Sequence, residues 1–96
     1  MPAYVIGRLQ IRDPSWVAEY VARNEVILRK HGGRYIVRTG QIESLEGDTP
    51  LPSAIVVLEF PSREHARAWY RDPEYAPLIE MRKYASTGDA ILVDAL

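Results

Sequence analysis

The chain has 96 residues and no cysteine, and its 12 Lys and Arg against 13 Asp and Glu give a net charge of −1. This length fits a single domain over residues 1–96, and the lack of thiols excludes disulfides, cysteine nucleophiles and cysteine-ligated zinc. The even charge balance, without a basic block, argues against nucleic acid as a partner. No apolar run reaches the roughly 20 residues of a membrane span, and the first residues lack a basic signal segment, so the expected location is the cytoplasm.

The first third of the chain predicts a strand and a helix. Residues Ala3–Ile11 are rich in β-branched and aromatic side chains, and Asp13-Pro14 is a helix-start signal. Over residues 15–30 apolar side chains recur at helical spacings, which predicts an amphipathic helix. His31-Gly32-Gly33 ends it, because glycine adopts the left-handed conformation that closes a helix.

Two further strands are expected around a turn-rich connection. The strand pattern resumes over residues 34–45 with a bulge at Gly40, and residues 54–60 (AIVVLEF) form the most apolar segment of the chain. Residues 46–53 between them are rich in turn-forming side chains. The two strands are therefore predicted to form a hairpin.

The remainder of the chain predicts a helical region in two pieces and a final strand. Residues 62–71 predict one helix, and Asp72-Pro73 starts another that becomes regular only near Ala76, because Pro77 is tolerated in a first turn. Residues 88–96 predict a strand. The order β-α-β-β-α-β predicts a ferredoxin-like α+β sandwich, a four-stranded antiparallel sheet with helices on one face.

Apolar residues on both faces of two strands predict a homodimer. A sheet with helices on one face alternates apolar and polar residues, yet residues 55–58 and 91–93 are apolar throughout. The chain has no spare element for the second face, so the same face of a second subunit is the expected cover. The alternative is a monomer with a partly apolar surface.

Three blocks of the sequence resemble the domain-of-unknown-function 1330 family. They are residues 31–38 (HGGRYIVR), 57–62 (VLEFPS) and 68–75 (AWYRDPEY), and the likeness extends to the opening Pro2-Ala3-Tyr4-Val5. The resemblance implies membership of the dimeric α+β barrel superfamily, in which two ferredoxin-like subunits pack sheet to sheet. That superfamily also holds cofactor-free monooxygenases and small isomerases. The resemblance implies no reaction, because this family has no established catalytic residues.

Arg38 and Glu59 interrupt otherwise apolar strands. A hairpin centred between Asp48 and Thr49 places them directly opposite each other, where opposite charges stabilise a strand pair by roughly 0.2 to 1 kcal/mol. The functional interpretation is a polar floor in an apolar cavity, with Arg38 as a fork for a carboxylate, phenolate or enolate oxygen and Glu59 as a base. The alternative is a structural ion pair.

The two histidines offer one candidate. His31 is predicted near the buried stripe of its helix, either as a general acid or base at the mouth of a pocket or as a cap for the helix carbonyls. His65 is expected to be exposed in the first turn of a helix. Two histidines without cysteine or the spacing of a zinc site lead to the prediction of no metal.

Aromatic residues offer a second set of candidates. Tyr4, Trp69 and Tyr75 are the residues expected to line a cavity for a planar ligand. The alternative is that they only fill the core, which is the commoner role of aromatic side chains in folds of this kind.

These features favour a small cofactor-free enzyme, monooxygenase- or isomerase-like, that acts on a small apolar or aromatic oxygenated molecule. A non-catalytic ligand-binding or structural dimer is the main alternative. A further alternative is a tautomerase whose base is Pro2, exposed by removal of the initiator methionine. An RNA-recognition module is excluded, because residues 55–60 lack the base-stacking pattern and Glu59 repels phosphate.

Overall fold

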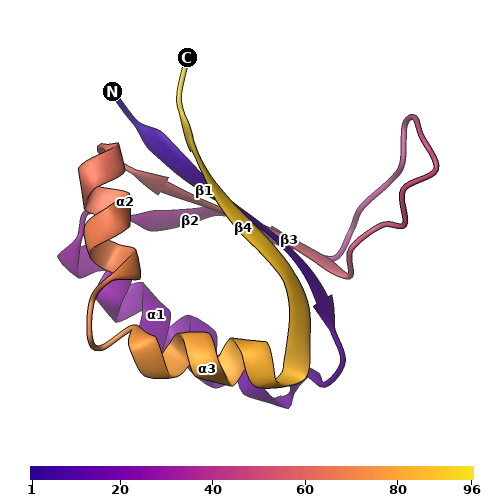
Figure 1. The fold of residues 1–96 in the computed structure, drawn as a ribbon, viewed down its shortest axis with the longest axis horizontal. Helices are drawn as coiled ribbons and strands as arrows, with labels where there is room; N and C mark the ends of the chain where they lie inside the picture. Colours follow the sequence, from indigo (N-terminus) through magenta and orange to yellow (C-terminus); the bar gives the residue numbers. More distant parts are fainter.

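Four strands form one antiparallel sheet in the order β2-β3-β1-β4 in the computed structural model, which describes residues 1–96 (Figure 1). The central strand β1 pairs with β3 on one side and with β4 on the other. The predicted ferredoxin-like α+β fold is confirmed. The strands are β1 (Ala3–Ile11), β2 (Arg34–Thr39), β3 (Ala54–Phe60) and β4 (Ser86–Asp94).

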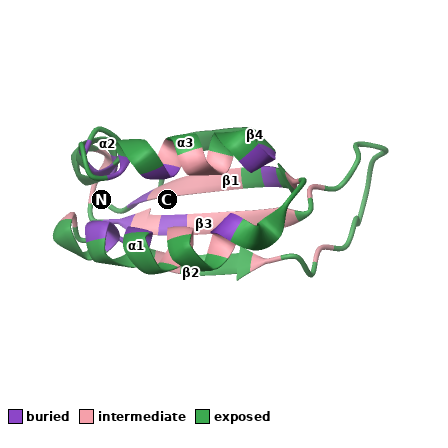
Figure 2. Ribbon diagram, turned by 90° about the horizontal axis from the view of Figure 1, so that it is seen from below, coloured by how far each residue is buried: buried purple, intermediate pink, exposed green.

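Helices cover one face of this sheet. A short 3-10 turn (Pro14–Trp16) leads into α1 (Val17–Lys30), whereas α2 (Arg63–Tyr70) and α3 (Ala76–Ala85) follow β3. Figure 2 shows α1 along β2 and β3, with α2 and α3 over the half of the sheet that contains β1 and β4. None of these helices has the length and apolar character that crossing a membrane requires.

Local signals in the sequence start the helices where they were predicted. The Asp13 carboxylate accepts a hydrogen bond from the Ser15 backbone amide at 2.9 Å, and the Ser62 hydroxyl accepts one from the His65 amide at 3.3 Å. Such caps satisfy amides that have no partner inside the helix. Pro77 lies in the first turn of α3, where its missing N–H is tolerated.

Two glycines end α1 and bring it against the sheet. Gly32 has a φ of +74°, and the amides of Gly32 and Gly33 donate to carbonyls of the last helical turn at 3.1 and 2.7 Å. A Cβ atom at Gly33 would lie 2.5 Å from the ring of Phe60. Backbone amides therefore cap this helix; that of His31 donates to the Leu28 carbonyl at 2.9 Å, while the His31 ring bonds to Asp72.

The predicted second strand is too long. β2 ends at Thr39, and residues 40–53 form a loop that projects away from the sheet (Figure 1). Pro50 and Pro52 on the returning side of this loop cannot donate to a strand ladder, so residues 41–45 find no partner. The last strand also starts earlier than predicted, at Ser86 directly after α3.

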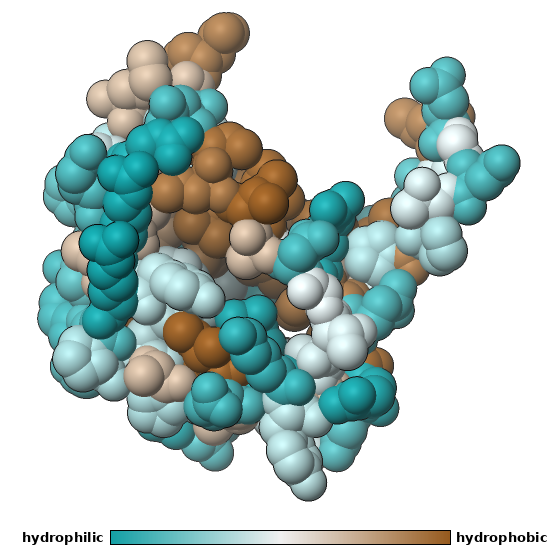
Figure 3. Space-filling view, in the orientation of Figure 1, coloured by the Kyte–Doolittle hydropathy of each residue, from teal (hydrophilic) through white to brown (hydrophobic).

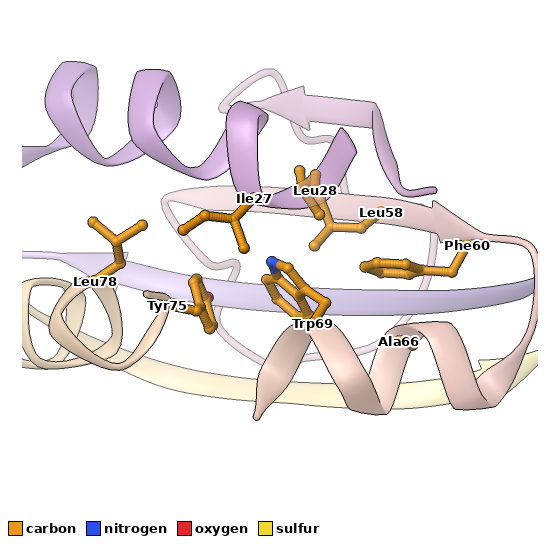
Figure 4. Close-up of a cluster of buried hydrophobic side chains, with 8 residues drawn as sticks. All are labelled: Ile27, Leu28, Leu58, Phe60, Ala66, Trp69, Tyr75 and Leu78. Carbon is orange, nitrogen blue, oxygen red and sulfur yellow. The ribbon is translucent and has the colours of Figure 1, made fainter. Parts of the chain in front are cut away.

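The hydrophobic core lies between the sheet and the helices. Alternation along the strands directs every second side chain toward the helices, where residues of β3 meet residues of α1 and α2. Burying such a side chain stabilises the fold by roughly 1.5–3 kcal/mol. Figure 4 shows the main cluster, formed by Ile27, Leu28, Leu58, Phe60, Ala66, Trp69, Tyr75 and Leu78.

Candidate functional site

A cavity lies between the helix-facing side of the sheet and the helices. It has a volume of about 100 Å³ and a mouth open to solvent, and 15 of its 20 lining residues are hydrophobic. The lining residues are Val5, Gly7, Leu9, Ile11, Trp16, Val17, Tyr20, Val21, Asn24, Tyr35, Arg38, Ala54, Val56, Leu58, Trp69, Tyr70, Tyr75, Arg82, Asp89 and Ala90.

Small residues on the strands leave this space open. Gly7, in the middle of the central strand, lies between Val56 of β3 and Ala90 of β4. A Cβ atom at Gly7 would meet its nearest neighbours only at 3.9 Å, so a Cβ atom fits there without displacing them. Strands favour β-branched and aromatic residues at such positions, and their absence here deepens the floor of the cavity.

A buried amide positions two aromatic residues of the cavity wall. Asn24 on α1 is 1% exposed; its Oδ1 accepts from Trp69 Nε1 at 2.9 Å, and its Nδ2 donates to the Tyr35 hydroxyl at 3.0 Å. Figure 4 shows the indole nitrogen of Trp69 turned toward α1. Burial raises the pKa of Tyr35 to about 12, so its hydroxyl stays protonated at neutral pH.

A second polar group forms where α1 meets α3. The hydroxyl oxygens of Tyr20 and Tyr75 are 2.5 Å apart and share a hydrogen bond. Burial is the main cause that raises the pKa of both phenols, whereas the guanidinium of Arg82 acts in the opposite direction. Both phenols are therefore neutral at physiological pH and serve as hydrogen-bond donors and acceptors.

Two buried donors beside the cavity have no partner in the protein. They are Nε1 of Trp16 and Nε of Arg82. Most buried polar atoms in proteins have a hydrogen-bond partner, so a buried donor without one requires an explanation.

The predicted pairing of Arg38 with Glu59 is wrong. Arg34 stands opposite Glu59, with 2.8 Å between its guanidinium and the carboxylate, whereas Arg38 stands opposite Val56. The bulge lies between Tyr35 and Val37 instead of at Gly40. Its extra residue reverses the alternation of the strand, so Arg38 points to the helix side while Glu59 remains on the open side.

The structure brings three of the six predicted site residues to the cavity. Trp69 and Tyr75 line its wall, and Arg38 lies at its edge with its guanidinium 5.0 Å from the centre of the Tyr35 ring. This guanidinium also lies 4.0 Å from the carboxylate of Glu25.

The other three residues lie outside the cavity. Tyr4 pairs with Glu59 across β1 and β3, on the open face of the sheet. His31 lies beyond the end of α1, where its Nε2 is 2.7 Å from the carboxylate of Asp72. The catalytic roles of His31, Arg38 and Glu59 stay predictions. Pro2 is exposed and outside the lining, and its carbonyl accepts a hydrogen bond from Ala95 at 2.9 Å.

Sequence reasoning missed the polar residues that organise the cavity. Asn24 had a visible signal, because it interrupts the apolar stripe of α1 at a position that points to the core. Gly7 had another, because an isolated glycine in a strand marks a bulge or a close approach. No sequence signal pointed to Arg82, because a charged residue near the end of a helix is ordinarily exposed to solvent.

Comparisons with solved structures show which proteins share this fold. RPA0582 from Rhodopseudomonas palustris, a protein of unknown function, superposes with a TM-score of 0.79 at 19% identity, covering 99% of this chain and 82% of that one. SnoaB from Streptomyces nogalater, a cofactor-independent oxygenase, superposes with a TM-score of 0.72 at 16% identity, covering 99% and 93%. HapK from Hahella chejuensis gives a TM-score of 0.61 at 11% identity, covering 98% and 92%. The chain thus has the ferredoxin-like fold of the α+β barrel proteins.

The family is more specific than this fold. The chain belongs to the family described as Domain of unknown function (DUF1330), which matches residues 2–96. A search of the curated proteins found no match.

Proposed function

We propose that the chain binds a small apolar or aromatic molecule that carries oxygen atoms, and converts it without a cofactor. The observation that carries this proposal is the cavity, whose exposed surface is almost entirely apolar and whose walls include several aromatic side chains. A pocket of this kind favours a planar apolar body.

The chemistry suited to this cavity is stabilisation of negative charge on a substrate oxygen. The hydroxyls of Tyr20, Tyr35 and Tyr75 stay protonated because burial raises their pKa values. Neutral phenols in an apolar site donate strong hydrogen bonds to a developing enolate or phenolate. SnoaB, which shares this fold, is a cofactor-independent oxygenase, so the fold is compatible with a reaction that needs no cofactor.

A non-catalytic ligand-binding protein is the second candidate. Asp89 is the one carboxylate among the lining residues, and it is paired with Arg8 at 2.9 Å. No histidine lines the cavity. A site with donors but without a free base favours binding over proton abstraction.

We also propose that the open face of the sheet binds the same face of a second copy. Its side chains include Ile6, Val57, Ile91 and Val93, and Ile91 is 48% exposed. Figure 3 shows apolar side chains gathered over the strands between α2 and the projecting loop. An apolar surface of this kind marks an interaction site in soluble proteins, and a two-fold axis lets one such face cover another. We likewise retain the cytoplasm as the proposed location.

A cavity-filling variant tests the binding proposal. Gly7→Val places a β-branched side chain on the cavity floor, where strand propensity favours it by up to about 1 kcal/mol. In a thermal-shift screen against aromatic acids, phenols and lactones, we expect ligands to stabilise the wild type but not Gly7→Val. Thr87→Val, in exposed β4, is the matched control and responds like the wild type. No response from the wild type, or equal responses from Gly7→Val, contradicts the proposal.

Catalysis is then tested with the compounds that bind. Incubation in air, with product analysis by mass spectrometry and oxygen uptake in parallel, should reveal an oxygenated or isomerised product with the wild type only. Binding without any product favours the non-catalytic candidate.

A further inference from the structure

We infer that the ligand of the cavity is an organic anion, an apolar or aromatic carboxylate, and that Arg82 binds its carboxylate group. This inference rests on the proposed function and adds the chemical class of the ligand. Three features of the site lead to it: an arginine without a counter-charge, a surplus of hydrogen-bond donors and a basic cleft.

Arg82 is a partly buried cation without an anionic partner. It lies on α3 and borders the cavity beside Tyr20 and Tyr75. None of the ion pairs of the chain includes it. Its guanidinium has only the neutral hydroxyls of Tyr20 and Tyr75 as hydrogen-bond partners, and its Nε atom is buried without any partner. Removing a charge from water is costly unless an opposite charge is supplied, so an anion completes this site. A guanidinium binds a planar carboxylate through two parallel N–H groups.

The uncommitted polar groups at the cavity are donors. The Tyr35 oxygen accepts from Asn24, which leaves its own proton free. Within the Tyr20–Tyr75 pair one proton is used between the two oxygens, and the other is left over. Trp16, which is 9% exposed, has an unpartnered indole N–H. A ligand rich in acceptor oxygens satisfies these groups, whereas an amine does not.

A basic cleft connects Arg82 with the surface. It lies between α2, α3 and β4 and shares Trp69, Tyr70 and Arg82 with the cavity. Arg71, Lys83 and Arg67 line it as well, with Arg67 at 3.9 Å from the carboxylate of Glu64. The one carboxylate of the cleft, Asp89, forms an ion pair with Arg8. Figure 3 looks onto the side of the molecule where β4 forms the edge of the sheet. Clustered positive charge in a cleft attracts anionic ligands and raises their rate of association.

Arg38 is a weaker candidate for this role. Its guanidinium already lies over the Tyr35 ring and near the Glu25 carboxylate. Arg82 is therefore the cation that remains available to a ligand.

A matched pair of ligands tests the inference by isothermal titration calorimetry. The compounds are 2-naphthoate and 2-naphthamide, which share the apolar ring system and differ in charge. We expect the wild type to bind the acid at least about tenfold more tightly than the amide. Arg82→Gln should remove this preference and leave amide binding in place. Arg29→Gln, at an exposed site on α1, is the control and keeps the preference.

Two further measurements cover the case in which Arg82→Gln does not fold. Raising the salt concentration from about 50 to about 500 mM should weaken naphthoate binding to the wild type but not naphthamide binding. Arg82→Lys, which keeps the charge but loses the planar fork, should lose most of the preference for the acid.

The outcomes separate the two proposals. If acid and amide bind equally, or if phenols and lactones bind while carboxylates do not, the anion inference is wrong and the proposed function stands, provided that Gly7→Val abolishes the binding. If no compound of any class binds the wild type, the proposed function itself fails.

Discussion

Asp72 joins the end of α1 to the connection between α2 and α3. Its carboxylate lies 2.7 Å from Lys30 Nζ and 2.7 Å from His31 Nε2, and it accepts a hydrogen bond from the backbone amide of Glu74 at 2.8 Å. The hydrogen bonds from Lys30 and then His31 hold the pKa of Asp72 well below its usual range. This contact ties the C-terminal end of α1 to the connection between α2 and α3, and it accounts for the position of the His31 ring.

Replacing this carboxylate tests its contribution to stability. The pKa of an aspartate in an unfolded chain is about 3.9, and a lowered folded-state pKa stabilises the protein above that value. We expect the wild type to unfold at higher urea than Asp72→Asn between about pH 5 and pH 8, with the difference shrinking below about pH 4 as the carboxylate is protonated. Asp48→Asn, in the exposed loop, is the control. A difference that is constant down to low pH argues against the ionic role of Asp72.

At the scale of single residues, the sequence predicted part of the site. Trp69 and Tyr75 were predicted because aromatic residues at helical spacing mark the buried face of a helix. The links between Asn24 and Tyr35, and between His31 and Asp72, join residues that are distant in the chain. Side-chain contacts of this kind depend on how helices pack, which local patterns do not encode.

At the scale of elements, the register of the β2–β3 hairpin decides which charges meet. A double-mutant cycle with Arg34→Ala and Glu59→Ala should give a coupling of roughly 0.2–1 kcal/mol in urea unfolding, because the two residues stand opposite each other. The same cycle with Arg38→Ala and Glu59→Ala should give no coupling. Coupling in the second cycle and not in the first contradicts the register described here.

Local signals account for most of the elements, whereas the hairpin depends on tertiary contacts. The limits of β1 and β3 and the starts of α2 and α3 follow from strand propensity, caps and prolines in the sequence. Arg34 and Tyr35 reach Glu59 and Asn24 on opposite faces by ordinary strand alternation. The bulge after Tyr35 then places Arg38 on the same face as Tyr35, where its guanidinium lies 5.0 Å from the centre of the Tyr35 ring, and no local pattern signals this.

At the scale of the whole molecule, the two faces of the sheet are suited to different partners. The helix-facing side holds the cavity, and the opposite side offers an apolar surface. Because the cavity lies on the other side of the sheet, a dimer through the open face adds no residue of the second subunit to it.

Sedimentation tests the dimer. We expect a species of about 22 kDa at micromolar concentration, twice the 10.9 kDa of the chain. Val57→Asp places an unpaired charge in the interface and should yield monomer or unfolded protein. Val26→Asp, on the outer side of α1 where the residue is 62% exposed, should leave the dimer intact. A wild type that stays near 11 kDa contradicts the interface.

The central claim is that the cavity binds a ligand, and nuclear magnetic resonance of the two tryptophan side chains tests it most directly. The chain contains two tryptophans, Trp16 and Trp69, and both line the cavity. A proton–nitrogen correlation spectrum therefore gives two indole signals that report from inside it. Titration with 2-naphthoate should shift both signals with one common saturation curve in the wild type, and neither in Gly7→Val. Indole signals that stay in place while other amides respond would contradict the account.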